Sequence, residues 1–261
     1  MKTRVSTYTA TLLKRRWLSK KTFEITLSRP PTFEFKPGQR INLSADEHER
    51  DYSIISAPAE SEIALCIRKV PGGMLSTLLS NAAIGTSLSF NGPYGYFTYH
   101  PSPRSAAFIA TGTGIAPFCS MARSGISGYT LLHGVSLPEE LYYAFLFQQS
   151  AKNYVACLSE PTTTRAAGGL DFSARGAKRQ GREVPQSLRV EPGAKHPVWK
   201  TQPKKLPADS FQGKVTQYLA QHLESKAYDF YLCGRREMIR EVTLLIDERF
   251  AGSLVYTELF Y

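Results

Sequence analysis

The sequence predicts two domains of different architecture: an antiparallel β domain, followed by an α/β domain with a doubly wound parallel sheet. The first hundred residues hold short runs that alternate apolar and polar residues between Gly/Pro turns, a pattern typical of an antiparallel barrel or sandwich. Farther along the chain, compact apolar strands alternate with helices. The chain has 261 residues, of which 42% are hydrophobic, enough for two cores of moderate size.

Six strands are expected in the first domain, separated by turns rich in proline and glycine. Between the fifth and the sixth strand, the apolar residues of 72–82 recur on one helical face, which predicts a short helix. The expected strands cover residues 6–18, 22–30, 38–45, 50–58, 63–70 and 86–95.

The second domain is expected to begin after a Pro-rich connection, so that the domains span 1–103 and 104–261. Alternation of strands with helices favours a parallel sheet covered on both faces. The expected strands cover residues 106–111, 129–135, 153–159, 229–234 and 253–261. The expected helices cover residues 119–125, 138–151, 214–225 and 235–250.

Most of the positive charge lies in one segment, 162–208, which fits neither pattern. It contains ten Lys/Arg and three Asp/Glu, which is +7 of the chain's net charge of +10. We interpret this Gly/Pro-rich segment as a basic insertion that is at least partly disordered. It is either a solvated insertion without chemistry or a contact for nucleic acid or an acidic partner. Nucleic acid is disfavoured because Phe172 and Trp199 are its only aromatic residues.

Several classes of protein find no support in the composition. No run approaches the roughly 20 apolar residues of a membrane span, and the first residues contain no apolar stretch of signal-peptide length, so a cytoplasmic protein is expected. The four cysteines are far apart and stand in apolar runs. We therefore expect buried, reduced thiols and no metal site, iron–sulfur cluster or disulfide framework.

Three polar residues stand close together on one expected strand. Arg50, Tyr52 and Ser53 allow two interpretations that the strand pattern alone leaves open. They are the polar edge of a half-exposed strand, or they are three contacts to one flat ligand that carries phosphate.

Two glycine-rich turns each lead into an expected helix. Gly72 and Gly73 precede the short helix of the first domain, and residues 110–117, ATGTGIAP, join a strand to a helix in the second. Glycine lets the backbone approach a ligand, and the free N–H groups of a helix start attract phosphate. Each turn alone is equally compatible with a tight connection. The second departs from the G-x-G-x-x-G fingerprint because Pro117 interrupts it.

The order of these motifs resembles the ferredoxin–NADP⁺ reductase superfamily. RDYSI, VPGGMLSTLL, GPYGYF, ATGTGIAPF, YLCG and YTELFY follow one another along nearly the whole chain, with 162–208 outside the resemblance. The combination is far more specific than any single motif. It implies a six-stranded FAD-binding β-barrel followed by a domain that binds NAD(P).

The resemblance implies roles for residues of the first domain toward FAD. Arg50 would neutralise the flavin pyrophosphate, Tyr52 would pack against the isoalloxazine, and Ser53 would hydrogen-bond near flavin N5. The donors to the FAD phosphates would come from Gly73, Met74 and Ser76.

The resemblance also implies a nicotinamide site in the second domain. Cys233 and Gly234 would lie beside the nicotinamide, and Glu258 would be the family's carboxylate near the C-terminus. Phe260 stands at the usual stacking aromatic position and Tyr261 is an extra final residue, so which of the two covers the flavin is open. The turn that receives the nucleotide would consist of Thr111, Gly112, Thr113, Gly114 and Pro117.

The choice between NADH and NADPH is left open by the residues after the third strand. Relatives that use NADPH usually place an arginine after a serine there, whereas this chain has Ser159 followed by Glu160. A carboxylate near the adenosine ribose favours a 2′-hydroxyl and repels a 2′-phosphate. Against this lean to NADH, Arg165, Arg235 and Arg236 are near enough in sequence to supply a phosphate site.

We therefore expect a reductase that contains FAD, oxidises NAD(P)H and passes single electrons to an acidic protein such as ferredoxin or flavodoxin. Hydride transfer from nicotinamide to flavin is the cofactors' own chemistry, and the protein supplies orientation and charge. Two alternatives stay open. One is a reductase of small acceptors (free flavin, a ferric chelate or a quinone), and the other is a non-catalytic binding protein that uses the basic insertion.

Overall fold

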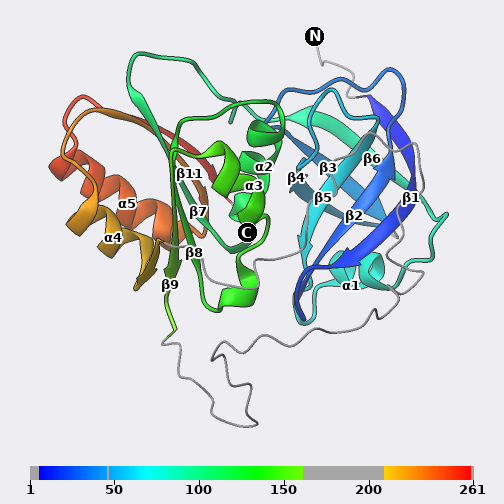
Figure 1. The fold of residues 1–261 in the computed structure, drawn as a ribbon. Helices are drawn as coiled ribbons and strands as arrows, with labels where there is room; N and C mark the ends of the chain where they lie inside the picture. The colour runs from blue at the N-terminus through cyan, green and yellow to red at the C-terminus, as the bar shows by residue number, and fades with distance from the viewer. Residues whose placement is uncertain (1–5, 46, 161–208, 260–261) are drawn as a thin grey trace, which may run out of the picture.

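Two six-stranded sheets lie side by side in the computed structural model, which describes residues 6–45, 47–160 and 209–259 (Figure 1). Our predictions for the basic segment 162–208 and for Phe260 and Tyr261 lie outside the described residues. The connection between the sheets runs from Tyr94 to Ser105, and the expected domain boundary at 103/104 lies within it.

The first sheet is antiparallel throughout, with the strand order β4-β3-β6-β1-β2-β5. Its edge strands β4 and β5 meet only at the bridge between Ile54 and Leu65, so the curled sheet closes at that end. The six predicted strands and the helix α1, Met74–Asn81, are confirmed. The strands are β1 Thr7–Trp17, β2 Thr22–Ser28, β3 Arg40–Ala45, β4 His48–Ser53, β5 Glu62–Arg68 and β6 Ser87–Tyr94.

Strand β5 is apolar on both faces because each face belongs to a different core. Ile63, Leu65 and Ile67 pack in the core of the first sheet. Ala64 and Cys66 pack instead in a core shared with the second domain. Alternate residues of a strand point to opposite faces, so one strand serves both cores. The two domains are therefore joined by buried apolar surface.

The second sheet is parallel, with the strand order β10-β9-β8-β7-β11-β12. Helices α2 and α3 cover the face toward the barrel, and α4 and α5 cover the other (Figure 1), which confirms the doubly wound prediction. The chain runs outward from β7 in one direction and then returns to β11 on its other side, so the strand order reverses between β7 and β11. A switch point of this kind opens a crevice at the carboxyl ends of the strands.

The elements of this domain have the following bounds. Its strands are β7 Ser105–Thr111, β8 Thr130–Val135, β9 Asn153–Leu158, β10 Ser210–Gln212, β11 Tyr228–Gly234 and β12 Leu254–Leu259. Its helices are η1 Gly112–Ile115, α2 Ala116–Arg123, η2 Pro138–Glu140, α3 Ala144–Ser150, α4 Val215–His222 and α5 Arg236–Arg249. The short edge strand β10 is an element that the sequence analysis missed.

The expected continuous helix over 138–151 is wrong, because the chain breaks between η2 and α3. Tyr142 donates a hydrogen bond to Thr22 Oγ1 at 2.8 Å, and Tyr143 donates one to Glu24 at 2.9 Å. Tyr143 also has a φ of 60°, in the left-handed region that interrupts a helix. Two contacts with the barrel therefore override the local helical pattern. Helix α2 also begins earlier than expected, at Ala116.

Candidate functional site

Two cavities meet between the domains. The barrel cavity, of about 760 Å³, is lined by β4, the end of β5, the start of α1 and Glu258. The sheet cavity, of about 610 Å³, lies at the carboxyl ends of β7, β8, β9 and β11. Arg68 and Thr113 line both. A ligand in one cavity can therefore reach a ligand in the other.

The barrel cavity lies where β4 and β5 separate, and β4 brings three predicted residues to it. Arg50, Tyr52 and Ser53 all line it. Ser53 is 3% exposed, and its Oγ has no hydrogen-bond partner among the described residues. Burial raises the pKa of Tyr52 to about 12, with the positive charge of Arg50 acting in the opposite direction, so its phenol stays protonated at neutral pH. The cavity wall offers a cation, an aromatic ring and an unpaired hydroxyl.

The loop before α1 forms the next part of the wall. Ser76 Oγ accepts a hydrogen bond from the backbone N–H of Val70 at 3.2 Å, so this hydroxyl holds the loop. A Cβ at Gly73 would lie 2.9 Å from Ser76 Oγ and 3.1 Å from the Val70 carbonyl oxygen. A side chain at residue 73 would push against the Ser76 hydroxyl, at the edge of a cavity that Gly73 and Ser76 both line. Met74 does not line it, and its side chain is 59% exposed.

The carboxylate of Glu258 enters the same cavity from the last described strand, β12. Its Oε1 lies 2.7 Å from Arg40 Nη1, and Arg40 Nε lies 2.9 Å from Asp51 Oδ2. Burial raises the pKa of Glu258, and the positive charge of Arg40 lowers it. These ion pairs connect the parallel sheet to the barrel across the cavity.

Glycines that allow close backbone approach shape the sheet cavity, which charged side chains also line. A Cβ at Gly114 would lie 2.3 Å from the carbonyl oxygen of Cys233, and one at Gly234 would lie 2.1 Å from Thr111 Oγ1. These close approaches bring η1 against the end of β11. The turn at 111–113 and Gly234 thereby line the crevice at the switch point, the usual place for a nucleotide in such a sheet.

A buried histidine that the sequence analysis missed supports this turn. His133 of β8 is fully buried, and its Nε2 donates to the Gly112 carbonyl oxygen at 3.2 Å. Burial lowers the pKa of His133 to about 4, although the hydrogen bond to Gly112 acts in the opposite direction. The ring is therefore neutral at pH 7 and carries its proton on the nitrogen that faces the turn. Gly112 has a φ of 54°, so this bond holds a left-handed glycine in place.

The predicted site residues divide into three groups. The barrel cavity is lined by Arg50, Tyr52, Ser53, Gly73, Ser76 and Glu258. The sheet cavity is lined by Thr111, Gly112, Thr113, Ser159 and Gly234. The residues that line neither cavity are Met74, Gly114, Pro117 and Cys233. Burial raises the pKa of the Cys233 thiol, which makes it a poor thiolate.

Charged residues that the sequence analysis did not assign also line the cavities. Arg40 and Arg68 line the barrel cavity, and Glu140 and Lys214 line the sheet cavity. Arg68 could have been recognised from the sequence as a candidate site residue, because it is a charged residue that ends an otherwise apolar strand. Glu160, by contrast, is exposed and does not line the sheet cavity.

The residues present fit the two nucleotides. The unpaired buried hydroxyl of Ser53 and the turn closed at Gly73 fit a flavin with its pyrophosphate, beside the cation of Arg50. Across Thr113, the glycine turn at the switch point fits a second nucleotide.

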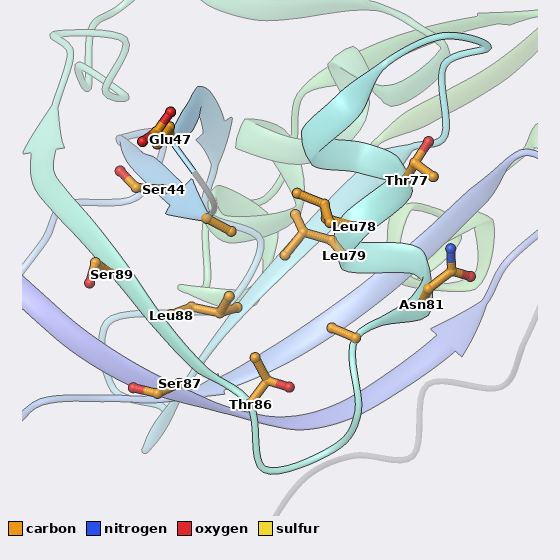
Figure 2. A pocket seen from close by; sticks show the side chains of 12 residues that line it. Ser44, Glu47, Thr77, Leu78, Leu79, Asn81, Thr86, Ser87, Leu88 and Ser89 are labelled. Carbon is orange, nitrogen blue, oxygen red and sulfur yellow. The ribbon is translucent and has the colours of Figure 1, made fainter.

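A third cavity, of about 560 Å³, lies between α1 and strands β3 and β6 (Figure 2). Its lining includes small hydroxyl side chains such as Ser44 and Thr77, and leucines such as Leu78 and Leu88. None of the predicted site residues lines it.

Two negative findings apply to the described part of the chain. Residues 6–45, 47–160 and 209–259 contain no cluster of three or more His, Cys, Asp or Glu side chains that could hold a metal ion. In the same ranges, no helix is both long and apolar enough to span a membrane.

Comparison with known proteins gives consistent matches. Residues 9–99 match the family model described as the oxidoreductase FAD-binding domain. Ferredoxin–NADP reductase B of Sorangium cellulosum is 34% identical over 173 residues, which cover 62% of this chain and 70% of that protein. The toluate 1,2-dioxygenase electron transfer component of Pseudomonas putida is 27% identical over 261 residues, which cover 94% of this chain. The chain spans only 65% of that relative's length.

A solved structure shows the same fold. The ferredoxin–NADP⁺ reductase from Neisseria gonorrhoeae with bound FAD and NADP superposes with a TM-score of 0.69 at 19% identity. The match covers 96% of this chain and 98% of the other. Both domains, and their succession along the chain, are therefore common to the two proteins.

Proposed function

Because the chain belongs to the ferredoxin–NADP⁺ reductase superfamily, we propose that it is an oxidoreductase that passes electrons from NAD(P)H through FAD to a one-electron protein acceptor. The meeting of the two cavities at Arg68 and Thr113 carries this proposal. It allows a nicotinamide held at the switch point to contact a flavin held by the barrel. FAD supplies hydride acceptance and single-electron release when it is bound.

The residues of the barrel cavity bind and orient the flavin. Arg50 neutralises the pyrophosphate, the ring of Tyr52 covers one face of the isoalloxazine, and the N–H groups at the start of α1 receive phosphate oxygens. The hydroxyl of Ser53 donates to, or accepts from, the flavin nitrogen at position 5. Its burial without another partner supports this role, since an unpaired buried hydroxyl destabilises a protein by about 1–3 kcal/mol.

The residues of the sheet cavity hold the nicotinamide nucleotide. The turn at Thr111–Thr113, together with Gly234, receives the sugar–phosphate backbone of this nucleotide. Lys214 and Arg235 offer positive charge to its phosphates. Glu258 lies on the barrel side of the junction, where its carboxylate can accept a hydrogen bond from the nicotinamide amide. The backbone carbonyl of Cys233 packs against Gly114, and the Cys233 thiol is buried. Phe260 and Tyr261 remain candidates for the aromatic cover of the flavin.

The proposed acceptor is a ferredoxin- or flavodoxin-like protein. The relatives support this, because one is a ferredoxin–NADP reductase and another an electron transfer component. The acidic character of the acceptor is part of the proposal. All four cysteines are buried and unpaired, which favours a reducing, cytoplasmic environment.

The test begins with the visible absorbance of the purified chain, with and without added FAD. We expect flavin bands and anaerobic bleaching of these bands by NADH or NADPH. We also expect oxidised ferredoxin to reoxidise the reduced protein faster than a ferric chelate or a quinone does. Protein that takes up no FAD would contradict the proposal. Faster reoxidation by a small acceptor would contradict only the choice of partner.

Ser53→Ala sharpens the test. We expect it to retain FAD and the fold but to slow flavin reduction about tenfold, because a hydrogen bond to a charged or strongly polar group contributes roughly 1.5 kcal/mol. Ser80→Ala is the matched control. Ser80 is also buried, but its hydroxyl donates to the Thr77 carbonyl oxygen at 2.8 Å, away from both cavities. Equal rates for the two variants would remove Ser53 from the site.

A further inference from the structure

Arg40 occupies a position in the barrel cavity that none of the motifs explains. It begins β3, and in the β3–β4 ladder it stands directly opposite Ser53. The next ladder pair on the same face joins Asn42 to Asp51. Opposite residues of antiparallel strands bring their side chains together. The side chain of Arg40 thus starts beside that of Ser53, on the strand face that also carries Asp51.

Arg40 binds two carboxylates at once, from different domains. Its Nη1 contacts Glu258 at 2.7 Å and its Nε contacts Asp51 at 2.9 Å. Asp51 is itself held by Asn42 Nδ2 at 2.9 Å. The planar guanidinium allows this two-sided contact, which a lysine ammonium reproduces poorly. The direction of the Glu258 side chain is therefore set from the barrel.

The backbone leaves room for this pair. Gly95 has a φ of 93°, and a Cβ there would lie 2.8 Å from Arg40 Nη1 and 3.9 Å from Glu258 Oε2. Gln39 Nε2 donates a hydrogen bond to the Gly95 carbonyl oxygen at 3.1 Å. The absence of a side chain at residue 95 thus admits the ion pair.

Without Arg40, the surroundings of Glu258 would oppose its charge. The side chain of Glu258 is only 12% exposed. Burial and the nearby Asp51 both raise its pKa, and Arg40 lowers it. Cys233 of β11, which lies behind it, is a buried neutral thiol. The other charged residues that line the cavity are Glu49, Arg50 and Arg68.

We propose that Arg40 is a positioning residue that keeps Glu258 ionised and aimed at the junction of the two cavities. This inference rests on the proposed function, in which Glu258 acts at the nicotinamide. Arg40 acts through Glu258 and Asp51. It ties the end of β12 to the barrel, close to the point where the two ligands meet.

The test compares Arg40→Gln with Arg40→Lys by stopped-flow reduction of the FAD-loaded protein from pH 5.5 to 9. Removing the cation raises the pKa of Glu258, so the acid limb of the rate profile moves to higher pH. We expect a shift of at least one pH unit and a rate about tenfold lower at pH 7 for Arg40→Gln. Arg40→Lys restores part of both. Arg16→Gln is the matched control, since it removes an ion pair at 3.0 Å with Glu24 outside both cavities.

A second readout needs no flavin. Chemical unfolding of Arg40→Gln, Glu258→Gln and the double variant forms a thermodynamic cycle. We expect the double variant to be more stable than the sum of the single effects predicts, because each single change strands a charge. An additive cycle, or a pH profile of Arg40→Gln that matches the native one, would overturn the inference. If the native protein bound no FAD, the cycle would still test the pair while the proposed function failed.

Discussion

The two cavities use different parts of the chain for the same task. The barrel cavity is lined by charged and hydroxyl side chains such as Arg40, Ser53 and Glu258, and its cross-links are ion pairs. The sheet cavity depends on contacts between backbone segments that only Gly114 and Gly234 permit. Side-chain contacts can be weakened one at a time, whereas a blocked backbone contact shifts whole strands. Substitutions should therefore have graded effects in the first cavity and abrupt effects in the second.

The strongest test of this contrast is Gly114→Ala. The new Cβ would lie 2.3 Å from the Cys233 carbonyl oxygen and 2.8 Å from Gly234 Cα, so η1 must move away from β11. We expect a loss of about 3 kcal/mol in the free energy of unfolding, the upper end for overpacking, and at least a hundredfold weaker nucleotide binding. Chemical denaturation and titration with NADH or NADPH measure the two effects.

Gly128→Ala is the control for that change. Gly128 has a φ of 80°, but no atom would lie within 4 Å of an added Cβ. An alanine there would lower the free energy of unfolding by about 1 kcal/mol, because it must adopt a left-handed conformation. It should leave nucleotide affinity unchanged. Equal nucleotide affinities for Gly114→Ala and Gly128→Ala would show that the close approach of Gly114 to Cys233 does not form the cavity.

The second test addresses His133, the support beneath the glycine turn. Its pKa is about 4 in the folded protein, against about 6.5 in an unfolded chain. As the pH falls, His133 is therefore protonated at a higher pH in the unfolded protein than in the folded protein. The stability contributed by neutral His133 is complete above pH 6.5, declines between about 6.5 and 4, and is lost below that. The loss amounts to about 3 kcal/mol.

His133→Gln isolates this contribution. Its amide can still donate to the Gly112 carbonyl oxygen but does not titrate. We expect the difference in unfolding free energy between the native protein and this variant to change by about 3 kcal/mol between pH 7 and pH 4. An NMR titration of the native imidazole checks the same pKa without any variant. A native pKa near 6.5 would contradict the explanation.

The same contrast explains what could be predicted from the sequence. The strands of both sheets other than β10, and the glycine turn at 110–117, follow from local patterns, because turn glycines and strand alternation depend on near neighbours. The pair between Arg40 and Glu258 joins residues 218 positions apart and forms only when the domains pack. The break after Glu140 likewise depends on contacts of Tyr142 and Tyr143 with the barrel. Local pattern thus predicted the strands and turns that border both cavities, but not the ion pair that crosses the barrel cavity.

The smallest expected effect concerns the choice between NADH and NADPH, where charge acts within the sheet cavity. Glu140 lines the sheet cavity, and its Oε2 accepts the backbone N–H of Ser136 at 3.2 Å. Glu160, the residue suggested by the sequence, is exposed and does not line it. A carboxylate near a 2′-phosphate repels it, and water weakens that repulsion for an exposed group. We therefore expect any discrimination between NADH and NADPH to depend on Glu140 more than on Glu160.

Steady-state dye reduction with both nucleotides tests this expectation. Glu140→Gln should raise the ratio of kcat/KM for NADPH to that for NADH about fivefold, an effect of roughly 1 kcal/mol. Glu160→Gln, which removes the same charge from the adjacent surface, should change the ratio by less than about twofold. The reverse order would return the role to Glu160 and show that the nucleotide extends past the end of β9. Equal, small changes would mean that neither carboxylate faces the ribose, and that Lys214 and Arg235 dominate the electrostatics of this cavity.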